Sequence, residues 1–143
     1  MIIVDHSNSP SSRWYSGSGI YRHVWLTVTN PIHVSTWGTS VTTPKVSEGS
    51  AEVRIVTTIE NDSDKNRSIL IYNRIIDSHG KEVAFTKSHV IVEKGKSGNA
   101  DQQISIQEPV LWSIENPYLY NMETTVKVNG KVSDIYKTAF GIR

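Results

Sequence analysis

Short segments in which apolar and polar residues alternate are the feature that most constrains this chain. In the clearest of them, Ala51, Val53, Ile55, Thr57 and Ile59 fall on one face, while Glu52, Arg54, Thr58 and Glu60 fall on the other, with Val56 as the exception. Successive side chains of a β-strand point to opposite faces, so this period of two predicts a half-buried strand. Turn-forming residues follow it at Asn61–Asp64. Since no stretch shows convincing helical periodicity, the sequence predicts an all-β fold.

Further strands are predicted between residue 67 and the end of the chain. Arg67–Asp77 is apolar on both faces, which is typical of a strand that is central in its sheet or covered by a neighbour. Asn129-Gly130 is the strongest hairpin signal, because a type I′ turn needs positive φ at both central residues. The other predicted segments are a turn at 77–80, an extended segment over 81–92, a turn at 94–98, a strand over 99–106, a loop with room for one short helical turn over 109–116, and strands over 118–128 and 131–140.

From these segments we predict about seven strands after residue 38, separated by turns about every ten to fifteen residues. Such spacing favours an antiparallel immunoglobulin-like β-sandwich with Greek-key topology, which we place at residues 31–143. A chain of 143 residues is long enough for one such domain with its own core, and some of its length remains.

The first thirty residues follow a different pattern. Ile20–Thr29 reads as a strong strand with Val24, Leu26 and Val28 on one face, and Asn30-Pro31 ends it. This strand has no hairpin partner before it, so we interpret residues 1–30 as the last strand of a preceding domain. Since an unpaired strand exposes backbone groups that seek a partner, we expect it to fold back onto the sandwich, to pair with a second copy, or to lie disordered.

Composition excludes several classes of function. The net charge of +1, spread along the chain, indicates neither a nucleic-acid partner nor an anionic membrane surface. No apolar stretch is long enough to cross a membrane, and the N-terminus lacks the pattern of a signal peptide. The absence of cysteine removes disulfides, thiolate metal sites and cysteine nucleophiles, but it leaves the compartment open.

The candidate chemical groups are few, and each has a simpler interpretation. Glu108 and Glu115 flank Trp112, but hydrolysis of a glycosidic bond needs two carboxyl groups on either side of that bond and no cleft is predicted in this loop, so we interpret them as surface carboxylates. Glu60, Asp62 and Asp64 do not match a calcium loop, so we interpret them as solvated turn residues. The five histidines show no His-x-x-x-His spacing. We therefore expect no catalytic residue, no metal site and no cofactor.

Several short motifs resemble glycoside hydrolase family 2, which includes β-galactosidases, β-glucuronidases and β-mannosidases. Arg13–Arg22, with the sequence RWYSGSGIYR, resembles the end of that family's N-terminal sugar-binding-like jelly roll. The motifs that resemble the entry to its central immunoglobulin-like domain are His33-Val34, Trp37-Gly38-Thr39 and Val41–Pro44, and those that resemble its close are Pro109–Ser113, Asn116–Tyr120 and Phe140–Arg143. The ordered set is more specific than any one motif.

The resemblance implies a jelly-roll remnant at 1–30, a sandwich at 31–143, and a catalytic TIM barrel that would begin near Arg143. The family's two catalytic glutamates lie on that barrel, the acid/base one after an asparagine, and this chain contains no Asn-Glu dipeptide. The implied function is a non-catalytic spacer, not an enzyme by itself, whose partners are the jelly roll and the barrel of a parent glycosidase. By analogy with the family, we expect the parent to be an exported bacterial protein, and the sequence itself leaves the compartment open.

The aromatic residues leave one choice open. The aromatic residues are interpreted mainly as structural and interdomain residues. Together with two residues that are not aromatic, Leu111 and Arg143, the set chosen for this role is Trp37, Trp112, Tyr118, Tyr120 and Phe140. Leu111-Trp112 is expected to close one end of the sandwich, and Tyr118 or Tyr120 to bond its hydroxyl to backbone as a corner tyrosine. The alternatives are a carbohydrate-binding module, whose aromatic side chains stack on sugars, and a protein-interaction or adhesion domain.

Overall fold

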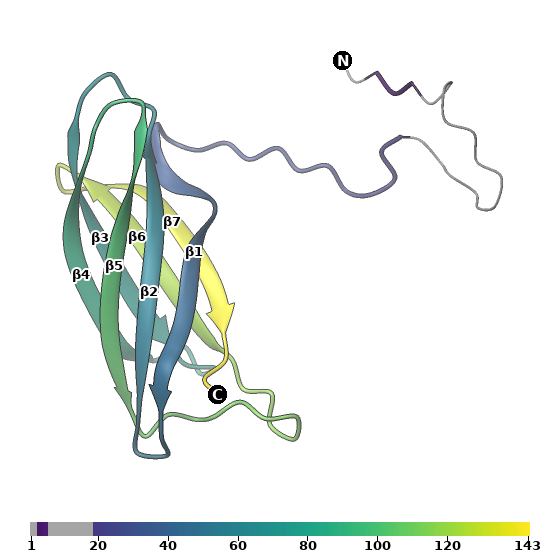
Figure 1. Ribbon diagram of the computed structural model, residues 1–143, viewed down its shortest axis with the longest axis vertical. Helices are drawn as coiled ribbons and strands as arrows, with labels where there is room; N and C mark the ends of the chain where they lie inside the picture. Colours follow the sequence, from purple (N-terminus) through teal and green to yellow (C-terminus); the bar gives the residue numbers. More distant parts are fainter. Residues whose placement is uncertain (1–2, 6–18) are drawn as a thin grey trace.

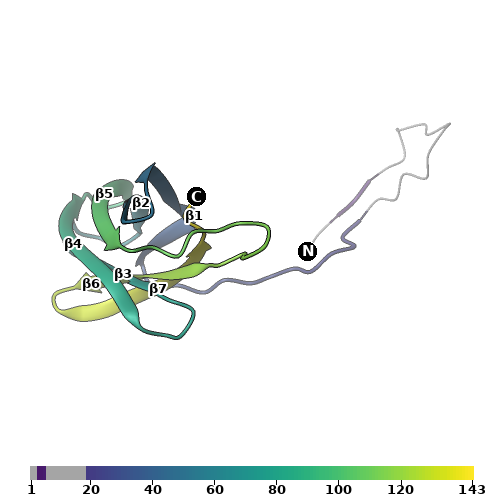
Figure 2. The same ribbon diagram turned by 90° about the horizontal axis from the view of Figure 1, so that it is seen from below.

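The chain folds into two antiparallel β-sheets packed face to face, as Figures 1 and 2 show in two views. The computed structural model describes residues 3–5 and 19–143, and every regular element in these ranges is a strand. The strands are β1 (Ile32–Val46), β2 (Ser50–Asn61), β3 (Arg67–Ile76), β4 (Glu82–Val92), β5 (Lys96–Gln107), β6 (Tyr120–Val128) and β7 (Lys131–Phe140). Among the described residues no helix could cross a membrane.

The strand order confirms the predicted immunoglobulin-like sandwich. One sheet has the order β1-β2-β5 and the other β4-β3-β6-β7, so the chain changes sheets after β2, β4 and β5. In the constant-type immunoglobulin domain the fourth strand pairs with the fifth, whereas here β4 pairs with β3. The strand predicted to be central, β3, does lie between β4 and β6.

The sandwich has two ends, which are named here for the path of the chain. The entry end contains residues 30–32 and the turns 62–66, 93–95 and 129–130, and the exit end contains residues 108–119 and 141–143 together with the turns 47–49 and 77–81. Asn129 and Gly130 have φ of 50° and 78°, as the predicted hairpin requires. The chain therefore enters and leaves the sandwich at opposite ends (Figure 1).

The core consists of two apolar clusters separated by a polar layer. The cluster at the exit end is Ala51, Val53, Ile55, Ile75, Ile106, Tyr120, Met122, Phe140 and Ile142, and the cluster at the entry end is Ile32, Val34, Ile59, Ile69, Ile71, Val92, Ala100 and Val126. Between them, Thr57, Asn73, Gln102 and Thr124 are each buried on a different strand. Asn73 Nδ2 donates to Gln102 Oε1 at 2.6 Å, and the Thr124 hydroxyl donates to Asn73 Oδ1. The Asn73–Gln102 bond connects the two sheets across the core, and the Thr124–Asn73 bond joins β6 to β3 within one sheet.

Two strand boundaries and one loop differ from the prediction. β5 begins at Lys96, inside the predicted turn, because its backbone continues the ladder with β2 to the Asn61–Lys96 pair. β6 begins at Tyr120 and not Tyr118, since the Tyr118 N–H donates to the nearby Asn116 carbonyl at 2.7 Å and not to a neighbouring strand. The segment 108–119 is irregular and contains no helical turn.

The strand predicted over residues 20–29 is absent. Residues 19–31 contain no strand, and Figure 1 shows this segment leaving the entry end away from the sandwich. Val24, Leu26 and Val28 are exposed, as are Tyr21 and Trp25. The physical reason is that a strand exists only within a ladder, and this segment pairs with none of the edge strands β1, β5, β4 and β7. The fold-back arrangement is therefore not adopted.

Candidate functional site at the two ends of the sandwich

Six of the seven residues selected from the sequence gather at the exit end. Tyr120 and Phe140 belong to the buried exit cluster, and Leu111 and Tyr118 pack against it. The Tyr120 ring stacks on Phe140 at 5.8 Å between centroids and meets Tyr118 edge-on at 5.0 Å. The register explains the stacking, since Tyr120 and Phe140 are cross-strand partners in β6 and β7. Leu111 thus covers apolar surface at this end of the core.

Both tyrosines bond their hydroxyls to backbone. Tyr120, the first residue of the penultimate strand, accepts a hydrogen bond from the Val110 N–H at 2.9 Å. Tyr118 accepts one from the Ser78 N–H at 3.1 Å. Burial raises the pKa of the Tyr120 phenol above its ordinary value, although the bond from Val110 opposes the shift. The position of Tyr120 is that of the corner tyrosine, and it ties the 108–119 loop to the sheet.

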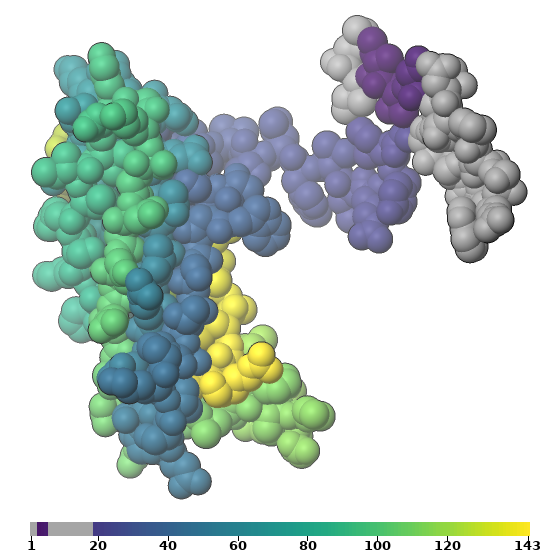
Figure 3. Space-filling model, in the orientation of Figure 1, coloured from purple at the N-terminus to yellow at the C-terminus, as the bar shows by residue number. Residues whose placement is uncertain are grey.

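Trp112 holds the last residues of the chain. Its backbone N–H donates to the Ile142 carbonyl at 2.8 Å, and the Arg143 guanidinium lies over its ring, 5.9 Å from the centroid. A Cβ on Gly141 would come within 3.1 Å of the Trp112 side chain, so the close approach depends on glycine. In Figure 3 the yellow C-terminal residues and the green loop lie together at this end. The direction in which the chain leaves the sandwich is therefore determined by packing.

Trp37 stands apart from the other six. It lies in an irregularity of β1 between Val34 and Thr39, with φ of 58° and 89% of its surface exposed. The following Gly38 has no room for a side chain, because a Cβ there would lie 2.7 Å from the Ser35 carbonyl oxygen. A backbone this constrained holds the indole outward into solvent.

A hollow of about 660 Å³ lies beside Trp37. It is formed by the start of β1, by the 134–136 part of β7 and by residues 25–29, and its lining residues include Trp25, His33, Trp37, Asp134 and Tyr136. Aromatic faces together with a few polar groups are the usual lining of ligand pockets.

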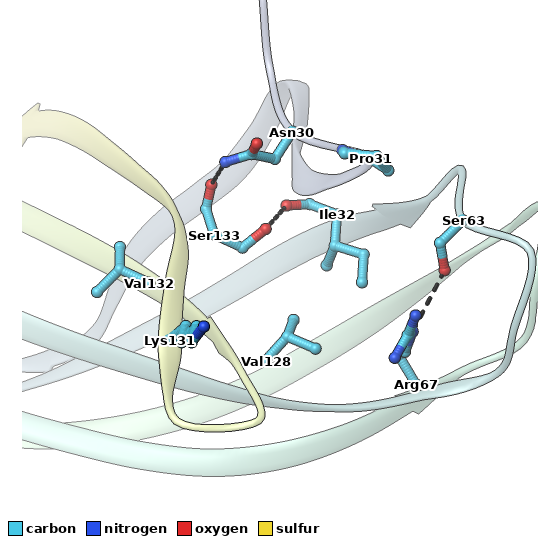
Figure 4. Close-up of a pocket in the computed structure, with 9 residues that line it drawn as sticks. All are labelled: Asn30, Pro31, Ile32, Ser63, Arg67, Val128, Lys131, Val132 and Ser133. Atoms are coloured by element: carbon cyan, nitrogen blue, oxygen red, sulfur yellow. Dashed lines mark hydrogen bonds between the residues drawn. The ribbon is translucent and has the colours of Figure 1, made fainter.

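The start of β1 is fastened to β7 at the entry end. Figure 4 shows the Asn30 side chain donating to the Ser133 carbonyl at 2.7 Å, while the Ser133 hydroxyl donates to the Ile32 carbonyl at 2.6 Å. These bonds lie beside a shallow hollow of about 320 Å³. Asp134 accepts a further bond from the Val34 N–H at 2.9 Å. Both points where the chain passes the boundary of the sandwich are therefore held by several contacts.

The carboxylates near Trp112 lack the properties of a catalytic pair. Glu108 and Glu115 are both exposed in the irregular segment. Hydrogen bonds from its own backbone N–H and from Ser113 lower the pKa of Glu115, whereas a general acid needs a raised one.

Two groupings of side chains depend on strand register and could not be predicted from the sequence. One is the polar layer of Asn73, Gln102 and Thr124. The other lies at the entry end, where β1 and β2 bring together His33, Glu60 and Asp62. The polar layer has no local spacing signal because its members come from different strands, and in the second grouping only Glu60 and Asp62 are close in sequence, since His33 comes from β1.

The sequence of residues 32–143 matches the family model for glycosyl hydrolases family 2. The chain belongs to this family. It is 46% identical over 142 residues to the β-galactosidase BoGH2A of Bacteroides ovatus, and 33% identical over 133 residues to a β-glucuronidase of Formosa agariphila. These alignments cover 99% and 87% of the chain but only 17% and 14% of the relatives.

A solved structure of a family 2 member from Bacteroides cellulosilyticus has the same arrangement. It superposes with a TM-score of 0.84 at 37% identity, over 92% of this chain and 18% of that one. The chain therefore spans less than a fifth of the length of these family 2 proteins, and over the part described it is a β-sandwich without a TIM barrel. This is consistent with a non-catalytic role.

Proposed function

We propose that this chain is a spacer domain of a longer family 2 glycosidase, in which it holds a preceding jelly roll and a following catalytic barrel at a set distance and orientation. The observation that supports it best is that the chain enters and leaves the sandwich at opposite ends, each tied by side-chain contacts (Figure 1). Seven strands and two apolar clusters make the body between these ends rigid.

The exit end supplies the mechanism of positioning. β7 passes into Gly141–Arg143, and Trp112 holds these residues by a backbone bond and by ring packing. A domain that begins after Arg143 would inherit the direction of this segment. In this proposal Leu111, Trp112, Tyr118, Tyr120, Phe140 and Arg143 are the structural residues of that connection, and Trp37 contacts a neighbouring domain.

The first test is hydrolysis of aryl β-galactosides and β-glucuronides by the isolated 143-residue chain. We expect no turnover above buffer, and measurable hydrolysis that copurifies with the chain would contradict a non-catalytic role.

A second test addresses positioning in the longer protein. Gly141→Ala should displace the Trp112 ring and lower kcat/KM, because the new Cβ falls 3.1 Å from that side chain. Gly49→Ala is the matched control, since a Cβ there meets nothing within 4 Å. The proposal that the exit end positions the next domain is contradicted by the following result: Gly141→Ala measurably destabilises the isolated chain, yet both variants of the longer protein retain full kcat/KM.

For residues 20–29 we propose that the partner is the sheet of the preceding domain. The segment carries exposed alternating side chains and makes no ladder within the sandwich. In the longer protein its amides should exchange slowly with solvent, and in the isolated chain they should exchange fast. Pairing with a second copy would instead make the isolated chain dimeric by light scattering and protect the same amides.

A weak carbohydrate contact is a second candidate function, and the hollow beside Trp37 favours it. Galactose or glucuronic acid that stacks on this indole should change the tryptophan fluorescence, and Trp37→Ala should abolish the change while Trp112→Ala retains it. No response at tens of millimolar sugar would reject this function.

A further inference from the structure

The grouping of His33, Glu60 and Asp62 at the entry end has the arrangement of a metal site. The ligand atoms of these three side chains, one from each residue, all lie within 4.8 Å of one another. His33 is largely buried, with 13% of its side chain exposed, and Asp62 faces solvent. Solvent can therefore reach one side of the group while the imidazole is held by the sandwich.

Strand register produces this convergence. His33 in β1 and Glu60 in β2 are direct cross-strand partners. Asp62 is two residues beyond Glu60, and its N–H donates to the Pro31 carbonyl at 2.8 Å, which continues the antiparallel pairing past the end of β2. Residues two apart in extended backbone point to the same side. The three side chains therefore share one face of the sheet.

The imidazole is oriented for metal binding by a group outside the cluster. His33 Nδ1 lies 3.0 Å from the Asn30 carbonyl oxygen, which can only accept a hydrogen bond, so Nδ1 carries a proton. Nε2 then faces Glu60. A histidine that binds a metal commonly donates its other ring N–H to a backbone carbonyl in this way, which fixes the tautomer and the ring.

Charge at the cluster is unbalanced. Within residues 3–5 and 19–143, Glu60 forms an ion pair only with His33, and Asp62 forms none. The nearby Lys96 pairs with Glu93 at 2.7 Å. With a neutral His33, the Nε2 lone pair would face a carboxylate oxygen at 3.5 Å, and the two would repel each other. A proton on Nε2 or a bound cation removes that repulsion.

The separation of His33 and Glu60 suits a cation. Two ligands at 2.0–2.1 Å from a tetrahedral zinc ion are separated by about 3.3 Å. His33 Nε2 and Glu60 Oε2 are 3.5 Å apart, which is longer than the usual N–H···O hydrogen bond. One nitrogen and two carboxylate oxygens suit a divalent transition metal, whereas Ca²⁺ prefers oxygen ligands alone.

We propose that His33, Glu60 and Asp62 bind a divalent transition metal of the zinc type, with water completing the coordination. The ion would link the start of β1 to the end of β2 and, through the Asn30 carbonyl, brace the point where residues 19–30 join the sandwich. This inference is independent of the proposed spacer function.

The experiment uses the 143-residue chain after treatment with a chelator and dialysis. Zn²⁺ is titrated by calorimetry at pH 7, and thermal unfolding is followed with and without Zn²⁺. Co²⁺ is used as a spectroscopic probe, because its visible bands distinguish tetrahedral from octahedral coordination. We expect one Zn²⁺ per chain, a higher Tm with Zn²⁺, and a Co²⁺ spectrum unlike that of the aqueous ion.

Neighbouring carboxylates supply the matched control. Asp62→Asn and Glu60→Gln should each weaken Zn²⁺ binding by at least about tenfold, whereas Asp64→Asn, in the same turn but outside the cluster, should change it by less than about threefold. His33→Gln should abolish the Co²⁺ spectrum, and His89→Gln should leave it unchanged. The proposal fails if Zn²⁺ neither binds nor raises the Tm, or if Asp62→Asn and Asp64→Asn weaken binding equally. The first failure would mean that His33 and Glu60 form an ordinary ion pair only.

Discussion

β2 and the segment 20–29 both alternate apolar and polar residues, yet only β2 is a strand. β2 lies between β1 and β5, which satisfy its backbone on both edges, and its inward side chains are fully buried. The segment 20–29 has no neighbour on either edge, and Leu26 is 90% exposed. Alternation thus specifies which face of a segment can be buried, whereas burial itself depends on what packs against it.

The largest expected effect compares the two segments directly. Ile55→Ala removes a side chain with no solvent exposure from the exit cluster and should lower the free energy of unfolding by about 2–5 kcal/mol. Leu26→Ala should change it by less than about 0.5 kcal/mol in the isolated chain. Urea denaturation followed by circular dichroism measures both. Similar losses in the two variants would mean that residues 20–29 pack on the sandwich after all.

The next effect tests the polar layer that divides the core. Asn73→Ala leaves the side-chain oxygen Oε1 of Gln102 and the Thr124 hydroxyl without their partner, which should cost about 1–3 kcal/mol in unfolding free energy. Asn99→Ala removes an exposed bond from Thr58 and is the control. If both variants unfold at the same urea concentration as the wild type, the layer does not stabilise the sandwich.

A smaller effect concerns the irregular segment at the exit end, which is ordered without belonging to a strand. Tyr120→Phe removes the acceptor of the Val110 N–H and should cost about 1 kcal/mol, measured by thermal or urea unfolding. Tyr118→Phe should cost less, because its partner Ser78 is exposed and water can replace the hydroxyl. The reverse order would make Tyr118 the residue that holds the segment.

The smallest effect is a pH dependence on the outer face of β2. Arg54 donates to Asp101 of β5 at 2.6 and 3.0 Å, and this bonding holds the pKa of Asp101 below its ordinary value of 3.8. A pKa that is lower in the folded state contributes stability above 3.8, and that contribution is lost as the pH falls through the folded value.

Because the Arg54–Asp101 pair is exposed, the contribution should be small and should weaken with salt. Asp101→Asn should therefore reduce the acid-induced drop in Tm slightly. At pH 7, Ile55→Ala should lower the Tm by the same amount whether residue 101 is Asp or Asn. An unchanged acid profile would show that this pair does not stabilise the fold.

Most of the fold could be predicted because its signals are local. The Asn129-Gly130 turn, the face pattern of β2 and the doubly apolar β3 each specify their own conformation, and all three agree with the structure. The start of β5 was misplaced because pairing with β2 extended the strand into residues that read as a turn. Residues 6–18, which carry part of the jelly-roll resemblance, lie outside the described residues.

The site was predictable only in part, because it depends on pairing between strands that are distant in the sequence. Tyr120 and Phe140 were selected as single residues, but their stacking depends on the register of β6 with β7. His33 and Glu60 were assessed separately and were set aside, because 26 intervening residues hide their cross-strand pairing.

By itself the sequence determined the class of fold, the number of strands, the principal turns and the family resemblance, because these depend on local alternation, on φ preferences and on short motifs. Only the tertiary structure decided that β4 joins β3, that residues 20–29 form no strand, that Trp37 stands apart from the other six residues, and that His33, Glu60 and Asp62 converge. Each of these depends on strand pairing between distant residues, and pairing energy arises only when a second strand is in place.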